Sequence, residues 1–195
     1  GYGFSSKSGR RFSPPVWKGQ IPTVQASLAL GFLDLQEVRF IDAFRRLGVS
    51  WITIRAVEEV ARARLKVSHP FCTLQFKTDG REIFREVEGK THSFLASQRY
   101  FERIIAPYLR GVDFKGQFPY RWWPMGHNHA VVLDPARSFG KPIVVKEGIP
   151  TSILAKAVQV EGSIDRVAVW YEVEKEAVQD AVEFEKSLTE RSLAA

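Results

Sequence analysis

The 195-residue sequence lacks the features that define disulfide-stabilised secreted proteins and membrane-spanning proteins. It contains one cysteine, Cys72, which excludes an internal disulfide and removes any argument for a disulfide-stabilised secreted fold. No apolar run approaches the roughly 18 to 20 residues that a membrane span requires. The first residues, Gly1–Phe4, contain no apolar signal segment. We therefore predict a cytoplasmic protein with no membrane association.

Motifs that would indicate catalysis or metal binding are also missing. The sequence has no Gly-x-Ser-x-Gly, no phosphate-binding loop ending in Gly-Lys-Ser/Thr and no Gly-x-Gly-x-x-Gly after a strand. His127 and His129, with His69 and Cys72 elsewhere, could begin a zinc site, but no Cys-x-x-Cys or His-Glu-x-x-His accompanies them. Cys72 lies among apolar neighbours and is predicted to be a small buried residue. We expect a protein that is not an enzyme and uses neither metal nor cofactor.

Charge is present, and it is distributed unevenly. The net charge of +6 divides into +9 for residues 1–130, with 20 basic and 11 acidic side chains, and −3 for residues 131–195, with 8 and 11. A basic half attracts polyanions such as nucleic acid, whereas an acidic half repels them. The alternative is that two solvated surfaces simply differ in charge.

The N-terminal half contains signals for a hairpin and a pair of helices. Residues 1–24 are rich in Gly, Ser and Pro, which predicts loop or short strand. Asp34 and Glu37 have the spacing of a capping box, so a helix is expected to begin at Asp34. Gly48 is predicted to end that helix and Ser50 to cap a second one. The second helix is predicted to bury four apolar residues, Ile54, Val57, Ala61 and Leu65.

The middle of the chain is harder to interpret. Residues 73–87 alternate between apolar and polar around Asp79-Gly80, which predicts a β-hairpin. A third amphipathic helix is expected to end near Pro107, with Phe101 among its buried residues. Residues 111–129, rich in Gly, Pro and aromatics, are expected to form a packed connector.

The C-terminal part predicts a small helical unit. Two short strands are expected at Val131–Leu133 and Pro142–Val145, followed by helices near 151–160, 163–171 and 174–190. Three short helices with tight turns suggest a helix-turn-helix-like bundle. The predicted fold class is mainly α with short β-hairpins, with units at 1–69, 70–129 and 130–195.

The first unit resembles the second half of a MerR-like winged-helix DNA-binding domain. The residues that carry this resemblance are a wing-like Gly9-Arg10-Arg11-Phe12, the Asp34–Ser50 helix and turn, and Ile54-Arg55. The family's first helix-turn-helix would lie before Gly1, so no base-reading residue can be assigned.

The last unit contains four short motifs in a fixed order: Leu133-Asp134-Pro135, Ser138–Pro142, Gly148–Thr151 and Glu161–Ile164. With these motifs it resembles the small C-terminal domain, of unknown function, of many bacterial antitoxins. One departure is visible, because Gly148 stands where that pattern has an arginine before Ile-Pro. In this order the two units resemble the VapB-type antitoxins. That resemblance implies a cytoplasmic homodimer that neutralises a PIN-domain ribonuclease toxin and represses its own operon by binding operator DNA.

Three arginines are the candidate DNA contacts. Arg10 and Arg11 are expected to reach phosphates from the wing, and Arg55 lies near a helix start, where phosphates commonly bind. The other exposed basic residues of the helix pair, such as Arg46 and Arg62, are better explained by ion pairs with acids on the same helix.

Four apolar residues are the candidate toxin or dimer contacts. Val132 and Val144 belong to short, edge-like strands that could pair with another chain. Trp122 and Trp123 belong to an aromatic cluster that could instead stack on single-stranded nucleic acid, although clamping a core or partner is favoured. Acidic residues along the last helix, Glu176, Asp180 and Glu183 among them, argue against DNA binding there.

Two other functions stay open from sequence alone. The chain could be a free-standing MerR-like regulator that binds a small ligand in its aromatic middle segment. An enzyme such as a nuclease, with its site in that segment, has the least support.

Overall fold

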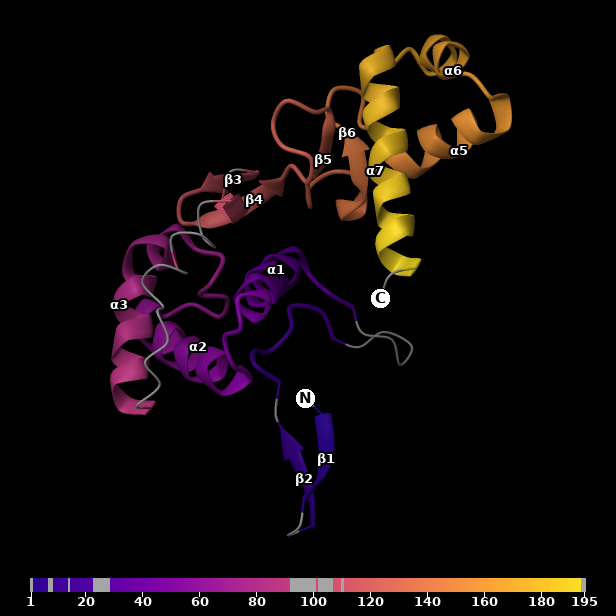
Figure 1. The fold of residues 1–195 in the computed structure, drawn as a ribbon. Coiled ribbons are helices and arrows are strands. Elements are labelled where there is room, and N and C mark those ends of the chain that lie inside the picture. The colour runs from indigo at the N-terminus through magenta and orange to yellow at the C-terminus, as the bar shows by residue number, and fades with distance from the viewer. Residues whose placement is uncertain are drawn as a thin grey trace. The chain divides into compact units, whose positions relative to one another are not determined.

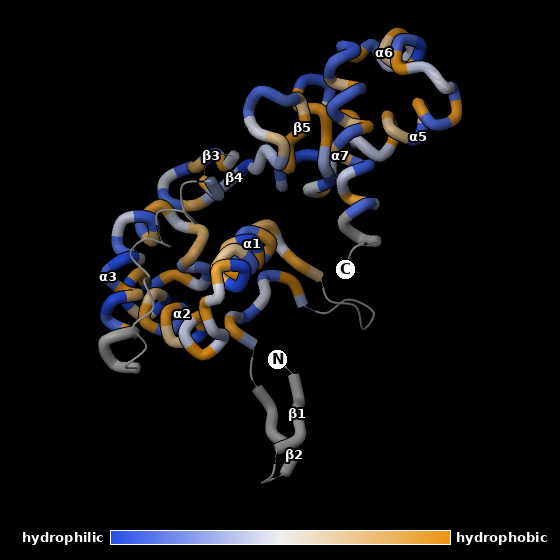
Figure 2. The backbone as a smooth tube through the Cα atoms, in the orientation of Figure 1, coloured by the Kyte–Doolittle hydropathy of each residue, from blue (hydrophilic) through white to orange (hydrophobic). Residues whose placement is uncertain are grey.

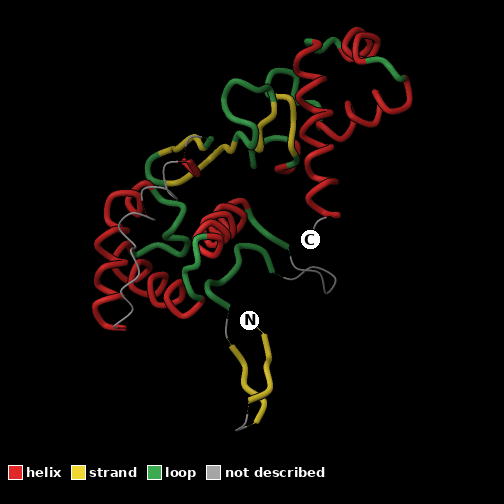
Figure 3. Tube along the Cα trace, viewed as in Figure 1, coloured by secondary structure: helices red, strands yellow, loops and turns green. Residues whose placement is uncertain are grey.

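The chain folds into two compact units, Gly1–Tyr108 and Leu109–Ala195 (Figure 1). This division differs from the boundaries at 69 and 129 expected from sequence. The computed structural model describes residues 2–6, 9–13, 15–22, 29–91, 101, 107–109 and 111–193, with side chains for 15–22, 29–87, 101, 107–109 and 111–190. Helices dominate and the strands are short and antiparallel, as the predicted fold class requires (Figure 3). No helix in this described part is long and apolar enough to cross a membrane.

The wing-like segment of unit 1 is a strand of a hairpin. β1 (Tyr2–Ser6) and β2 (Gly9–Ser13) pair antiparallel, and their register sets Arg10 opposite Ser5 and Arg11 opposite Phe4. The prediction of loop or short strand for this region is therefore confirmed, and the two short strands form a hairpin.

The first helix, α1 (Phe32–Arg46), begins two residues earlier than predicted. Gly31 is its N-cap, and Asp34 is the third helical residue, where its carboxylate accepts a hydrogen bond from the Gly31 N–H at 2.9 Å. The prediction of Asp34 as the cap was therefore wrong. A carboxylate in the first turn still satisfies a free backbone N–H and interacts favourably with the helix dipole.

The second helix, α2 (Trp51–Leu65), forms as predicted. The Ser50 Oγ caps it by accepting the Thr53 N–H at 3.1 Å. The four residues expected to be buried, Ile54, Val57, Ala61 and Leu65, are all inaccessible or nearly so. Figure 2 shows apolar and polar residues recurring along the helices of this unit, the pattern of amphipathic helices.

The predicted hairpin at 73–87 is wrong, because this segment is the helix α3 (Leu74–Thr91). Its buried residues recur at helical spacing along one face: Phe76, Gly80, Ile83, Phe84 and Val87. Gly80 serves close packing rather than a turn, because a Cβ there would lie 2.5 Å from the Phe101 ring. Tertiary packing thus overrides the local turn signal of Asp79-Gly80.

Aromatic rings form the centre of unit 1. Phe44, Phe71, Phe76, Phe84 and Phe101 contact one another, with ring centroids 5.0 to 6.5 Å apart. Most of the third helix expected from sequence lies outside the described residues, although Phe101 itself is buried as predicted.

Unit 2 contains a four-stranded antiparallel sheet in the order β3-β4-β5-β6. The two predicted strands are β5 (Val131–Leu133) and β6 (Pro142–Val144). The expected connector instead folds into a second hairpin, β3 (Val112–Lys115) and β4 (Phe118–Trp122), which joins the sheet where Trp122 pairs with Leu133.

Three helices complete unit 2, close to their predicted positions. They are α5 (Thr151–Glu161), α6 (Ile164–Tyr171) and α7 (Lys175–Leu193). Gly162 ends α5 with a left-handed φ of 67°, and Ser163 caps α6, as the sequence indicated. Their shared core consists of small aliphatic residues: Val144, Leu154, Val167, Val173, Ala177, Val178 and Ala181.

Candidate functional site

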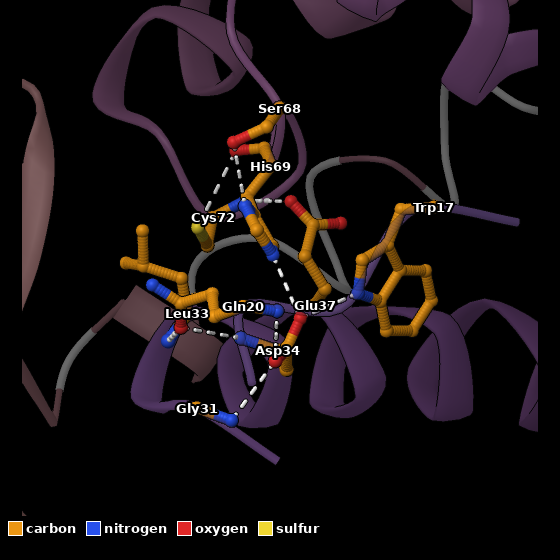
Figure 4. Close-up of polar contacts among 9 residues, drawn as sticks. All are labelled: Trp17, Gln20, Gly31, Leu33, Asp34, Glu37, Ser68, His69 and Cys72. Atoms are coloured by element: carbon orange, nitrogen blue, oxygen red, sulfur yellow. Dashed lines mark hydrogen bonds and ion pairs between the residues drawn. The ribbon is translucent and has the colours of Figure 1, made fainter. Parts of the chain in front are cut away.

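A buried carboxylate, Asp34, is the most densely hydrogen-bonded side chain among the described residues of unit 1 (Figure 4). Four donors surround it. The Trp17 indole N–H and His69 Nε2 lie 2.7 and 2.8 Å from Oδ1. The backbone N–H groups of Gln20 and Gly31 lie 2.8 and 2.9 Å from Oδ2. We call Asp34 and these four partners the Asp34 node.

The Asp34 node joins three segments that are distant in sequence. Trp17 and Gln20 belong to the arm 15–22 that follows the β1–β2 hairpin, Asp34 to α1, and His69 to the loop between α2 and α3. Gln20 also accepts the Leu33 N–H at 2.8 Å through its side-chain oxygen, which ties the arm to the start of α1 twice. The arm is therefore held on α1 by directional bonds rather than by apolar packing alone.

Hydrogen bonding decides the charge of Asp34. Burial alone would raise its pKa, but the bonds from His69, Gln20, Gly31 and Trp17 outweigh burial and lower the pKa below its ordinary value. Asp34 is consequently an ionised group in a site with no solvent exposure.

His69 connects this carboxylate to the surface. Its Nδ1 lies 2.9 Å from the exposed Ser68 Oγ, and its Nε2 lies 2.8 Å from Asp34. The order Ser–His–Asp is that of a proton relay. Asp34, however, also binds three donors of the arm and α1, so its geometry serves to hold these segments together.

Glu37 and Cys72 are a second buried pair beside the node. Glu37 Oε1 accepts the Cys72 N–H at 3.3 Å, while Oε2 has no hydrogen-bond partner among the described residues. Burial raises the pKa of Glu37 well above the ordinary range. Burial and the neighbouring Glu37 also raise the pKa of Cys72, so its thiol is a poor nucleophile. The prediction of Cys72 as a buried apolar residue is confirmed, with 1% exposure.

The three candidate DNA-contacting arginines lie on two elements. Arg10 and Arg11 are in β2, and their side chains lie outside the described residues. Arg55 is half-buried in the second turn of α2. Burial raises the pKa of Glu58, and the positive charges of Arg62 and Arg55 oppose that rise. The predicted ion pair between Glu58 and Arg62 is present at 3.6 Å.

Two of the four candidate contact residues in unit 2 have no exposed surface. Val132 and Val144 are both 0% exposed, because their strands lie against the helices of the same unit. Both side chains therefore belong to the core of the unit, whereas β6 is an edge strand of the sheet, so pairing of that edge with another chain stays a prediction. Trp122 and Trp123 are half-buried, and the Trp123 indole donates to Asp113 at 2.8 Å.

The two histidines that could have begun a metal site bind different carboxylates. His127 Nε2 lies 2.8 Å from Asp113, and His129 Nδ1 lies 2.8 Å from Asp180. Asp180 also accepts the Ala130 N–H at 2.7 Å, so its carboxylate is bound to the segment that leads into β5. Within the described residues, no three potential ligands of the His, Cys, Asp and Glu types come together.

Gly148, which stands where the antitoxin pattern has an arginine before Ile149, lies against an arginine from another part of the chain. The Arg137 guanidinium lies over Gly148, where an added Cβ would be 2.7 Å from Nη2. Arg137 also donates to the Val145 carbonyl at 2.5 Å. This contact holds the turn before α5, and the sequence pattern alone did not indicate it.

The chain is similar to a family model within unit 2 and to one named protein over most of its length. Residues 131–184, from β5 into α7, match the family model described as "Protein of unknown function (DUF433)". The chain is 24% identical over 169 residues to a Mycobacterium tuberculosis protein named "Putative antitoxin VapB45", covering 79% of this chain and 70% of that protein.

A solved structure shares the fold. The crystal structure of Rv2018 from Mycobacterium tuberculosis matches with a TM-score of 0.70 and 22% sequence identity. The match covers 86% of this chain and 85% of that one. The mainly helical architecture with short antiparallel strands is therefore a known one.

Proposed function

We propose that this chain is the antitoxin of a VapBC-like type II toxin–antitoxin module. In this role it is not an enzyme: it binds and neutralises a PIN-domain ribonuclease, and as a homodimer in the cytoplasm it represses its own operon by binding operator DNA. The observation that carries the proposal is the similarity to "Putative antitoxin VapB45" over 79% of the chain. The match of 131–184 to DUF433, the domain type expected from the antitoxin pattern, supports it independently.

The different net charges of the two units support different partners for each unit. Unit 1 has 17 basic and 10 acidic side chains, a net charge of +7, whereas unit 2 has 11 and 12, a net charge of −1. Three acids of unit 1, Asp34, Glu37 and Glu58, are buried. Its surface is therefore more basic than the net charge indicates, which favours phosphate binding by this MerR-like half.

The candidate DNA interface is the β1–β2 hairpin held by its anchored arm. A short hairpin can carry cations to the phosphate backbone and add affinity without reading bases. The Asp34 node fixes the arm that leaves this hairpin through Trp17 and Gln20. Arg10, Arg11 and Arg55 are the proposed phosphate contacts.

Co-purification tests the toxin half of the proposal. The full chain would be expressed together with the protein encoded by the adjacent reading frame, and captured through a tag on the chain. A stable complex that contains a PIN-domain ribonuclease is expected. Capture of a bound small molecule and no protein would instead favour a free-standing ligand-responsive regulator.

Salt-dependent DNA binding tests the second half. Fluorescence anisotropy would compare the operon's promoter with unrelated DNA of equal length. Arg11→Ala should weaken binding to both and reduce the slope of log K against log[salt] by about 1. Arg46→Ala is the matched control, because Arg46 is exposed and already paired with Asp42 at 2.8 Å. Equal effects of the two substitutions would contradict the hairpin as the phosphate contact.

A further inference from the structure

The helix α6 has one side in the core and one side unused by the unit. Val167 is fully buried, and Ile164 and Ala168 lie against the same core. The opposite side presents four residues, Asp165, Arg166, Val169 and Trp170, which we call the α6 face. Figure 1 shows α6 at the periphery of unit 2.

The charged half of the α6 face already has partners within the unit. The Asp165 carboxylate lies 2.7 Å from the Lys175 ammonium. Arg166 donates to the Glu161 carbonyl at 2.6 Å, with the Glu161 carboxylate 3.9 Å away. These charges are thus engaged, and the apolar half of the face is what remains for contact with another molecule.

That apolar half is unusually exposed. Val169 and Trp170 are neighbours in sequence, and 76% and 61% of their surface is accessible. Val160, in the last turn of α5, is a further apolar side chain with 76% exposure. A single exposed aliphatic residue needs no explanation, but an exposed tryptophan beside an exposed valine is typical of the anchor of a protein interface.

The surrounding charge indicates which partner suits this surface. Residues 161–176 contain five acidic side chains, Glu161, Asp165, Glu172, Glu174 and Glu176, against two basic ones, Arg166 and Lys175. Lys146 also lies 2.7 Å from Glu174, so five acids and three bases leave a net charge of −2. A second copy would bring like charges together, and nucleic acid would be repelled. A protein with a basic surface is attracted, and an enzyme that binds RNA phosphates carries such a surface.

We propose that the α6 face is the docking surface for a basic surface of the ribonuclease toxin, with Trp170 as the central anchor and Val169 beside it. This inference rests on the proposed antitoxin function and assigns that function to a named surface. It replaces the contact expected at Val132 and Val144, whose side chains are buried. The acidic residues around the anchor set orientation and association rate, whereas burial of the indole provides most of the affinity.

Affinity measurements on the full chain test the assignment. The toxin captured by co-purification would be titrated with wild type, Trp170→Ala and Phe139→Ala. Phe139 is the matched control, because it is a fully exposed aromatic residue in the turn Ser138–Gly140 of the same unit. Trp170→Ala should weaken toxin binding at least about 30-fold, and Phe139→Ala should leave it within about twofold. Far-UV circular dichroism and the Tm should match wild type for both, since neither side chain is in the core.

A charge reversal tests the choice of a basic partner. Glu172→Lys, beside the α6 face, should slow association, and the difference from wild type should shrink at high salt. Unchanged toxin affinity in Trp170→Ala overturns the inference, as does a larger loss in Phe139→Ala. Loss of a homodimer in Trp170→Ala with toxin affinity retained assigns the face to a second copy and also overturns it. Wild-type chain that binds no toxin overturns the proposed function as well.

Discussion

Replacing Asp34 with alanine removes the acceptor on which three segments of unit 1 converge. Four donors lose their partner: the Trp17 indole, His69 Nε2 and the N–H groups of Gln20 and Gly31. A buried donor left unsatisfied costs about 1–3 kcal/mol, but the two backbone groups lie near the surface, where water can replace the carboxylate. We therefore expect a loss of about 3–5 kcal/mol in the free energy of unfolding, because the Trp17 indole and the buried His69 each lose a hydrogen bond to a charged acceptor.

That loss is large for a unit of this size. A change of 1 kcal/mol shifts the Tm of a domain of about 100 residues by roughly 4–8 °C, so Asp34→Ala should lower the Tm of unit 1 by roughly 12–40 °C. Differential scanning calorimetry of the full chain measures this shift. Asp42→Ala is the matched control, since Asp42 lies on the same helix, is half-exposed and pairs with exposed Arg46, a contact worth less than about 1 kcal/mol. Equal, small effects of the two substitutions would refute the structural role of the Asp34 node.

Three further substitutions have defined expectations. Burial raises the pKa of Glu37, so this residue ionises at lower pH in the unfolded chain, and its contribution to stability falls as pH rises above 4.5. Glu37→Gln should remove this fall, so the variant's Tm relative to wild type should be higher at pH 7 than at pH 4.5 in thermal melts at both pH values. Gly80→Ala should destabilise unit 1 by about 1–3 kcal/mol in urea unfolding, despite alanine's better helix propensity, because the added Cβ meets Phe101; a stabilised variant would contradict the packing. Asp180→Ala should destabilise unit 2 by about 1–3 kcal/mol through the lost bonds to His129 and Ala130, whereas exposed Glu183→Ala on the same helix should stay within about 0.5 kcal/mol.

Elements with strong local signals could be predicted from sequence. α2 has a serine cap and four apolar residues at helical spacing, and both features form as expected. The helices α5 and α6 are likewise bounded by Pro150, Gly162 and Ser163, at positions that the local chemistry defines. Where the relevant physics lies within about ten residues, the prediction and the structure agree.

Features that depend on distant residues could not be predicted. Asp34 was identified as a helix-start residue, but its bond to His69 joins positions 35 apart, which no local pattern encodes. Asp79-Gly80 indicated a turn, and only the packing of Phe101 against Gly80 explains a glycine within α3. The full burial of the Val132 and Val144 side chains could not be predicted either, because it depends on helices of the same unit that pack on these strands.

Inhibition of RNA cleavage is the most direct test of the antitoxin function. The purified product of the adjacent reading frame would be assayed for cleavage of a fluorogenic RNA while full-length chain is titrated in, with Trp170→Ala and Phe139→Ala run in parallel. The proposed function predicts that wild type and Phe139→Ala abolish cleavage at a stoichiometric ratio. Cleavage that continues unchanged in the presence of excess wild-type chain would contradict it.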